Sequence, residues 1–201
     1  MISPAYFTLF QCVWAVWWAS LHRRIRSGRK YAIGRTAVGS DFLYRASNPL
    51  LFLMQNALCI ASFWSVSPWL LRFHNNDALR VIGMTLFIGG SVLYSWAVQH
   101  LGSNYSPCYD RHMPLHLVQT GPYRWIRHPM YAAKILVGVA TVVTSGSLWF
   151  LPTTIYFFGS TLTAMNSEDT ELARTLPGYL EYRRGKGMLI PNGGRILAAK
   201  N

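Results

Sequence analysis

Five long apolar stretches constrain this chain more than any other feature of its sequence. They cover residues 5–22, 49–71, 78–99, 130–146 and 148–165, and the last two are the shortest. A helix that crosses the hydrocarbon core of a bilayer needs about 20 mostly apolar residues. With 51% apolar and only 13% charged residues, the chain is too apolar for an ordinary soluble domain. The sequence therefore predicts an all-α integral membrane protein with about five transmembrane helices.

Basic residues predict how these helices are oriented. The loop between the first two stretches is rich in arginine and lysine, and such loops lie on the cytoplasmic side. Alternation then predicts an outside N-terminus, a cytoplasmic C-terminus and an outside turn at 145–147, in a bacterial inner membrane or the endoplasmic reticulum. The formal charge of +12 is assigned to the membrane surface, so no nucleic-acid partner is expected. The basic residues of the loop are Arg23, Arg24, Arg26, Arg29, Lys30, Arg35 and Arg45.

The two halves of the chain differ in character. Residues 1–99 hold the N-terminal transmembrane helices and the basic loop, whereas residues 100–201 begin with a polar segment that glycine and proline interrupt. This segment contains tyrosines and histidines, which are scarce in disordered regions, so we expect it to be ordered. After the last two spans, short charged helices are predicted near 166–174 and around Tyr179 and Tyr182. The first stretch lacks a basic flank before it and is read as a retained helix rather than a signal peptide.

His128 and Pro129 mark the start of the fourth span. Proline is favoured in the first turn of a helix because its missing N–H would be unpaired there anyway. Free backbone N–H groups and the positive end of the helix dipole favour a carboxylate or phosphate at such a point. The alternative is that Arg127 and His128 only anchor the helix at the membrane surface.

Several motifs together resemble the isoprenylcysteine carboxyl methyltransferase family and its phospholipid N-methyltransferase relatives. The resemblance spans about residues 95–192 and is carried by His116 to Arg124, Arg127-His128-Pro129-Met130-Tyr131 and Glu168-Asp169. It implies a methyltransferase core in residues 100–201 that uses S-adenosylmethionine without a Rossmann domain. The implied acceptor is a lipid-like or isoprenoid molecule from the bilayer, and no oligomeric state is implied. The residues implied to bind the cofactor are His116, Leu117, Val118, Gly121, Tyr123, His128, Tyr131 and Glu168.

The residues proposed for catalysis are Glu168, Arg127 and Arg124. A carboxylate acceptor, which we favour, is already ionised at pH 7, and either arginine would position it by a bidentate contact. An amine acceptor would have to lose a proton, and Glu168 or His128 would then be the base. Glu171 competes with Glu168 for the acidic role. A solvated helix start, whose acidic residues complement the helix dipole, is the alternative to both.

Two other functions compete with methyl transfer. Membrane reductases of sterol-like lipids share a similar C-terminal region but use a nicotinamide dinucleotide. A scaffold or transporter subunit would use the aromatic and basic residues as interface anchors. A transporter should carry ionisable residues in the middle of its spans, and the five stretches have none near their centres. The three cysteines suggest neither a disulfide framework nor a metal site.

Overall fold

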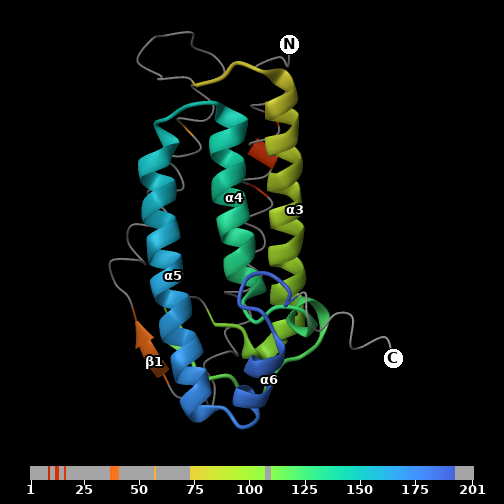
Figure 1. The fold of residues 1–201 in the computed structure, drawn as a ribbon, viewed down its shortest axis with the longest axis vertical. Coiled ribbons are helices and arrows are strands. Elements are labelled where there is room, and N and C mark those ends of the chain that lie inside the picture. The colour runs from red at the N-terminus through yellow and green to blue at the C-terminus, as the bar shows by residue number, and fades with distance from the viewer. Residues whose placement is uncertain are drawn as a thin grey trace.

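Three long helices and a small polar region at one end form the described part of the computed structural model (Figure 1). The structure describes residues 37–40, 73–106 and 110–192, with a few single positions nearer the N-terminus. Apart from those single positions and residues 37–40, the spans predicted at 5–22 and 49–71 and the basic loop lie outside the described residues.

Helix α3, Asp77–Leu101, is a 25-residue helix that covers the predicted span 78–99. Its first turn is capped by Asn76, whose side-chain oxygen accepts a hydrogen bond of 2.8 Å from the N–H of Ala78. It ends at Gly102, which has a positive φ of 51°. By length and composition, residues 77–104 are the one helical segment in the described part of the chain that could cross a membrane.

Helix α4, Pro129–Ser145, begins with the proline that predicted its start, and it ends at Gly146 in the left-handed conformation. This helix is apolar but only 17 residues long. It packs closely against α3 at two glycines. A Cβ atom added to Gly83 would lie 2.7 Å from the backbone nitrogen of Thr144, and one added to Gly90 would lie 2.9 Å from Val137. The glycines of α3 therefore allow close contact with α4, as small residues commonly do between packed helices.

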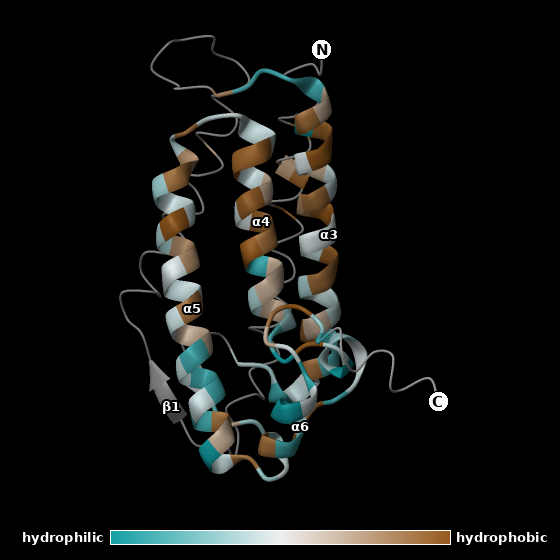
Figure 2. Ribbon diagram, in the orientation of Figure 1, coloured by the Kyte–Doolittle hydropathy of each residue, from teal (hydrophilic) through white to brown (hydrophobic). Residues whose placement is uncertain are grey.

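Helix α5, Phe150–Thr175, joins two segments that the sequence analysis separated. The predicted span 148–165 and the predicted charged helix 166–174 form one continuous helix of 26 residues. Figure 2 shows the change in character along it, with hydrophilic residues gathered at the end near α6. The change from apolar to charged residues thus marks a change of environment and not the end of a helix.

The polar end of the bundle holds the short elements. These are the 3-10 helices η3, Gly102–Asn104, and η4, Gly121–Arg124, and the helix α6, Tyr179–Gly185. A two-stranded antiparallel ribbon pairs β1, Ala37–Ser40, with β2, Asp110–His112. The all-α prediction omitted this ribbon, which ties the loop after the first predicted span to the polar segment.

Large apolar side chains project outward from α3 and α5. On a soluble domain, contiguous exposed apolar surface of this kind marks a contact with a partner or a membrane. The outward-facing residues include Val81, Ile82, Ile88 and Val92 of α3 and Ile155, Tyr156 and Phe158 of α5, each at least 45% exposed.

Candidate active site

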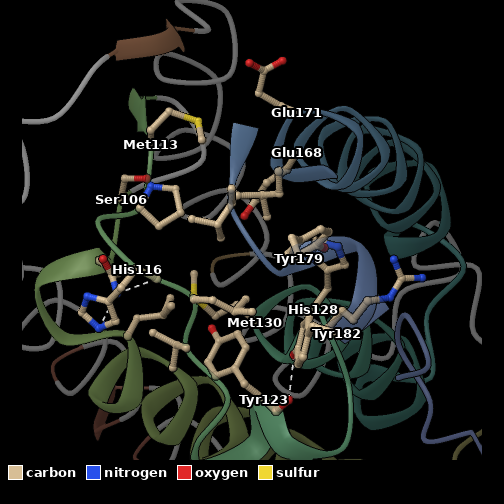
Figure 3. Close-up of a pocket in the computed structure, with 18 of the residues that line it drawn as sticks. Ser106, Met113, His116, Tyr123, His128, Met130, Glu168, Glu171, Tyr179 and Tyr182 are labelled. Atoms are coloured by element: carbon tan, nitrogen blue, oxygen red, sulfur yellow. Dashed lines mark hydrogen bonds between the residues drawn. The ribbon is translucent and has the colours of Figure 1, made fainter. Parts of the chain in front are cut away.

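A cavity of about 960 Å³, counted out to its open mouth, lies at the polar end of the three helices. Side chains from α4, α5, α6 and the segment between α3 and α4 converge on it (Figure 3). Ligand pockets for small molecules commonly combine apolar walls with a few polar groups. This cavity has the same composition. Its apolar wall includes Leu101, Leu117, Val118, Met130, Leu172 and Leu176.

Asp169 is the centre of the polar network beside this cavity. Its side chain is 3% exposed and forms a short ion pair with the guanidinium of Arg127. It also accepts a hydrogen bond of 2.6 Å from the hydroxyl of Tyr179, and its Oδ1 lies 3.2 Å from Nε2 of His128. The Nε of Arg183 approaches the other carboxylate oxygen at 3.3 Å. One buried carboxylate therefore joins α5, α6 and the segment that precedes α4.

These contacts shift the acid–base properties of the network. Burial alone would raise the pKa of Asp169, but hydrogen bonds from His128 and Tyr179 and the charge of Arg127 together hold it well below its usual value. Burial raises the pKa of Tyr179 far above its usual value, and the adjacent Asp169 carboxylate raises it further. Asp169 is thus a fixed negative charge, and Tyr179 remains a neutral donor.

Tyr131 and Glu168 form the second polar contact at the cavity. The hydroxyl of Tyr131 donates a hydrogen bond of 2.6 Å to Oε2 of Glu168, and both residues line the cavity. Tyr131 lies in the first turn of α4 because Pro129 opens that helix. The bond therefore brings a carboxylate of α5 to the N-terminus of α4.

Asn104 organises the opposite wall. Its side-chain oxygen accepts a hydrogen bond of 2.7 Å from the N–H of Leu115, which fixes the orientation of the amide. The amide nitrogen can then only donate, and it lies 3.1 Å from Nε2 and 3.2 Å from the backbone oxygen of His116. A neutral His116 must therefore accept at Nε2 and carry its proton on Nδ1.

Residues after α6 hold the start of α4 in place. The N–H groups of Arg127 and His128 donate to the backbone oxygens of Gly187 and Met188 at 2.9 and 3.0 Å. The hydroxyl of Tyr182 donates at 2.7 Å to the backbone oxygen of Tyr123. The chain leading into α4 is consequently fixed from the C-terminal side.

Most of the residues predicted for the site lie together at this cavity, and two do not. Arg124 is exposed, with its guanidinium 5.1 Å from the centre of the Trp125 ring, and it does not line the cavity. Gly121 does not line it either; it has a positive φ of 56° and lies tightly against the ring of His100. The predicted residues that do line the cavity are His116, Leu117, Val118, Tyr123, Arg127, His128, Tyr131 and Glu168.

The two competing glutamates differ in position. Glu171 also belongs to the cavity wall, but Figure 3 shows its carboxylate pointing away from the other labelled side chains. Glu168 contacts Tyr131 directly. The two acids, between which the sequence did not decide, therefore differ in the contacts that their carboxylates make at the cavity.

Asp169 and Tyr179 were not assigned site roles from the sequence. The sequence signal for Asp169 was its spacing, because Thr161, Met165 and Asp169 follow one another at intervals of four residues, and in the structure all three are buried. Residues at this spacing lie on one face of a helix. Tyr179 could not be placed without the turn at Gly178, whose φ of 77° starts α6.

Comparisons with known proteins agree with the predicted resemblance. The model of the family described as phospholipid methyltransferase matches residues 79–176, and this match confirms the resemblance. Three solved chains match. One is the eukaryotic intramembrane Ras methyltransferase, an isoprenylcysteine carboxyl methyltransferase, with 21% identity and a TM-score of 0.45.

The alignment with that solved structure covers 74% of this chain and 51% of the other, so this chain spans about half its length. The comparison with curated proteins gives no match. The segment matched by the family model contains η4, α4, α5 and nearly all of α3. The phospholipid methyltransferase model thus matches slightly less than half of the chain.

Proposed function

We propose that this protein is a membrane methyltransferase that uses S-adenosylmethionine to methylate a lipid-like acceptor at the cytoplasmic face of a membrane. One observation carries the proposal. Within the segment matched by the phospholipid methyltransferase model, the first turn of α4 and the carboxylate of Glu168 meet at a cavity with largely apolar walls.

The residues of the cavity fit this cofactor. Leu117, Val118 and Tyr123 offer apolar and aromatic surface to an adenosine group. The start of α4 suits a carboxylate, because its backbone N–H groups and helix dipole favour negative charge. Glu168 suits positive charge. When bound, S-adenosylmethionine supplies a methyl group on a positively charged sulfur.

The chain's own contribution is alignment and the exclusion of water. Transfer of a methyl group needs the reacting atoms in line more than it needs a strong acid or base. Asp169 holds Arg127, His128 and Tyr179 in a fixed arrangement. Tyr131 restrains Glu168 through its hydrogen bond. Both contacts limit the movement of groups that would surround the reacting atoms.

The arginines support a carboxylate acceptor less than the sequence suggested. Arg124 does not line the cavity, and Arg127 is engaged by Asp169. Glu168 is the carboxylate that faces the cavity with a single tyrosine partner in the described structure, which is suited to removing a proton from an amine. The proposal is therefore a lipid-like acceptor with a nucleophilic oxygen or nitrogen.

A membrane location is supported by two features of the described helices. Residues 77–104 have the length and composition of a span, and apolar side chains face outward from α3 and α5. The polar end, with its cavity, would lie at the cytoplasmic surface, where a soluble cofactor and a lipid can meet.

Labelled methyl transfer tests the proposal directly. Purified protein is incubated with S-adenosylmethionine carrying a labelled methyl group and a total membrane lipid extract, and labelled products are identified by mass. An ester product identifies a carboxylate acceptor, and a methylated amine identifies a nitrogen acceptor. Calorimetry with S-adenosylmethionine and with a nicotinamide dinucleotide separates this function from a lipid reductase. Binding of the dinucleotide alone, or of neither molecule, would refute the proposal.

A further inference from the structure

A second hollow lies beside the cavity. It is open to solvent and encloses about 870 Å³, counted out to its mouth. Arg127 lines both spaces and forms part of the wall between them. The other lining residues come from α6 and from the chain that follows it, and they are Leu180, Arg183, Arg184, Lys186, Gly187, Met188 and Asn192.

The hollow is strongly cationic. Four of its eight lining residues are arginine or lysine, and none is acidic. The buried carboxylate of Asp169 pairs with two of these cations, Arg127 and Arg183. Glu181 lies on α6 but does not line the hollow. Among the described residues that line the hollow, positive charge therefore exceeds negative charge.

Arg127 also has a hydrogen-bond donor without a partner among the described residues. Its side chain is only 10% exposed, and its Nε is buried with no hydrogen-bond partner among the described residues. A buried polar group without a partner is costly, and such groups in folded proteins commonly await a water or a ligand. The guanidinium has a planar arrangement of donors that matches phosphate oxygens.

We propose that this hollow is an anion site that binds the phosphate group of an anionic phospholipid. Arginines form charge-assisted and often bidentate hydrogen bonds with phosphate, and basic pockets at the cytoplasmic end of membrane helices bind anionic headgroups. The proposal concerns a second site and does not depend on methyl transfer.

The position of the hollow favours a lipid over a soluble phosphate. Gly187 and Met188 pair with the backbone immediately before the apolar helix α4, which places the hollow at the level where that helix would enter the membrane. Leu180 is 55% exposed and lines the hollow together with Met188. Apolar side chains beside four cations suit a molecule with a charged head and an apolar body.

Lipid retention in nanodiscs tests the inference. The full-length protein is placed in phosphatidylcholine nanodiscs that contain a minor fraction of phosphatidylglycerol, and the lipids it retains after release are counted by native mass spectrometry. The test variant is Arg184→Gln with Lys186→Gln, since neither residue contacts Asp169 in the described structure. The matched control is Arg174→Gln, an exposed arginine at the end of α5 that lines neither space.

The wild-type protein is expected to retain phosphatidylglycerol in preference to phosphatidylcholine. A cation near a membrane surface contributes about 1 kcal/mol to attraction of anionic lipid, or about five-fold in affinity. The double variant should therefore lose about 25-fold of this preference, whereas Arg174→Gln should keep it. The single variants, each with a loss of about five-fold, give the same answer if the double variant does not fold.

A parallel titration separates the two sources of phosphate. Inorganic phosphate is added to wild-type protein in uncharged detergent and its binding is measured by calorimetry. Binding of inorganic phosphate without preferential retention of phosphatidylglycerol would overturn the lipid assignment. Equal retention of both lipids by the wild type, with no phosphate binding, would overturn the anion site. An equal loss in Arg174→Gln would do the same, because only general surface charge would then be at work.

Discussion

The hydroxyl of Tyr131 and the carboxylate of Glu168 lie 2.6 Å apart, although the two residues are 37 positions apart along the chain. The bond joins the first turn of α4 to the polar end of α5. Both positions were named from the sequence as cofactor-binding residues. Their contact gives the sequence assignment a geometry that single substitutions can test.

Tyr131→Phe is expected to weaken binding of S-adenosylmethionine by about ten- to a hundred-fold, since a hydrogen bond to a charged group is worth roughly 1.5–3 kcal/mol. The aromatic ring and its packing remain, so the fold should persist. Calorimetry in detergent measures the affinity. Tyr156→Phe, at an exposed position of α5, is the matched control. Equal affinities in the two variants would remove Tyr131 from the site.

Glu168→Gln is expected to lower turnover at least ten-fold, because it removes the charge that faces the cavity while keeping the side-chain shape. Glu171→Gln should stay near the wild-type rate, since its carboxylate points away from the other labelled side chains (Figure 3). A loss confined to cofactor affinity would indicate a binding role, and a loss in kcat with binding intact would indicate a role in the transition state. Equal and small effects would show that this acidic turn is only a solvated cap.

Asp169→Asn is expected to destabilise the protein by about 3 kcal/mol at neutral pH, because it leaves the buried Arg127 without its counter-charge. Chemical unfolding in detergent measures the free energy. The control is again Glu171→Gln, whose carboxylate is partly exposed and has no ion pair in the described structure. If both variants unfold at the same denaturant concentration, the Asp169 network does not stabilise the fold.

The same substitution has a defined pH dependence. The pKa of Asp169 is lower in the folded protein than its unfolded value of about 3.9. Its stabilisation is therefore complete above pH 4 and is lost as the pH falls from there toward the lowered value. The difference in unfolding free energy between wild type and Asp169→Asn should be constant from pH 7 to about pH 5 and shrink below about pH 4. A constant difference through the acid range would contradict the shift.

Gly83→Ala is expected to destabilise the helix pair by about 1–3 kcal/mol, because its Cβ would meet the backbone of Thr144 at 2.7 Å. Gly89→Ala on the same helix has no atom within 4 Å of the added Cβ. It should leave stability unchanged or raise it by up to about 1 kcal/mol through helix propensity. Thermal unfolding in detergent compares the two. A larger loss in Gly89→Ala would show that α3 and α4 do not pack through Gly83.

Cysteine labelling tests the orientation. In a background without the native cysteines, a cysteine at Leu148 should react with a membrane-impermeant reagent added from outside. One at Glu181 should react only from the cytoplasmic side. Both positions are exposed. Leu148 lies in the turn between α4 and α5, and Glu181 lies in α6, which is at the opposite end of these helices (Figure 1). Labelling of both from the same side would refute the proposed topology.

Local chemistry made part of the fold predictable. Pro129 identified the start of α4, and apolar composition identified α3, because both signals depend on neighbours in the chain. The continuity of α5 was missed at Met165 and Asn166, where the composition changes but no residue breaks the helix. The ribbon of β1 and β2 was also missed, because strands of four and three residues leave too short a pattern.

For the site too, residues with a signal from their neighbours in the chain could be predicted and residues without one could not. The residues predicted between His116 and Tyr131 belong to contiguous motifs, and all of them except Gly121 and Arg124 line the cavity. Asp169 was overlooked beside Glu168 because one residue along a helix turns the side chain by about 100°, toward a different set of partners. Those partners come from two separate segments, residues 127–128 before α4 and residues 179 and 183 of α6. Only the folded arrangement brings them to one carboxylate.

The hydrogen bonds from Arg127 and His128 to Gly187 and Met188 have a consequence for biosynthesis. A chain emerges from the ribosome from its N-terminus, and its earlier parts can fold while later parts are still being made. The helices of this bundle are complete once residue 175 has been synthesised. The cavity wall that contains Arg127 and His128 can form its hydrogen bonds only after residue 188 has been synthesised. A nascent chain stalled before that point would hold its helices in place and yet have an unfinished binding cavity.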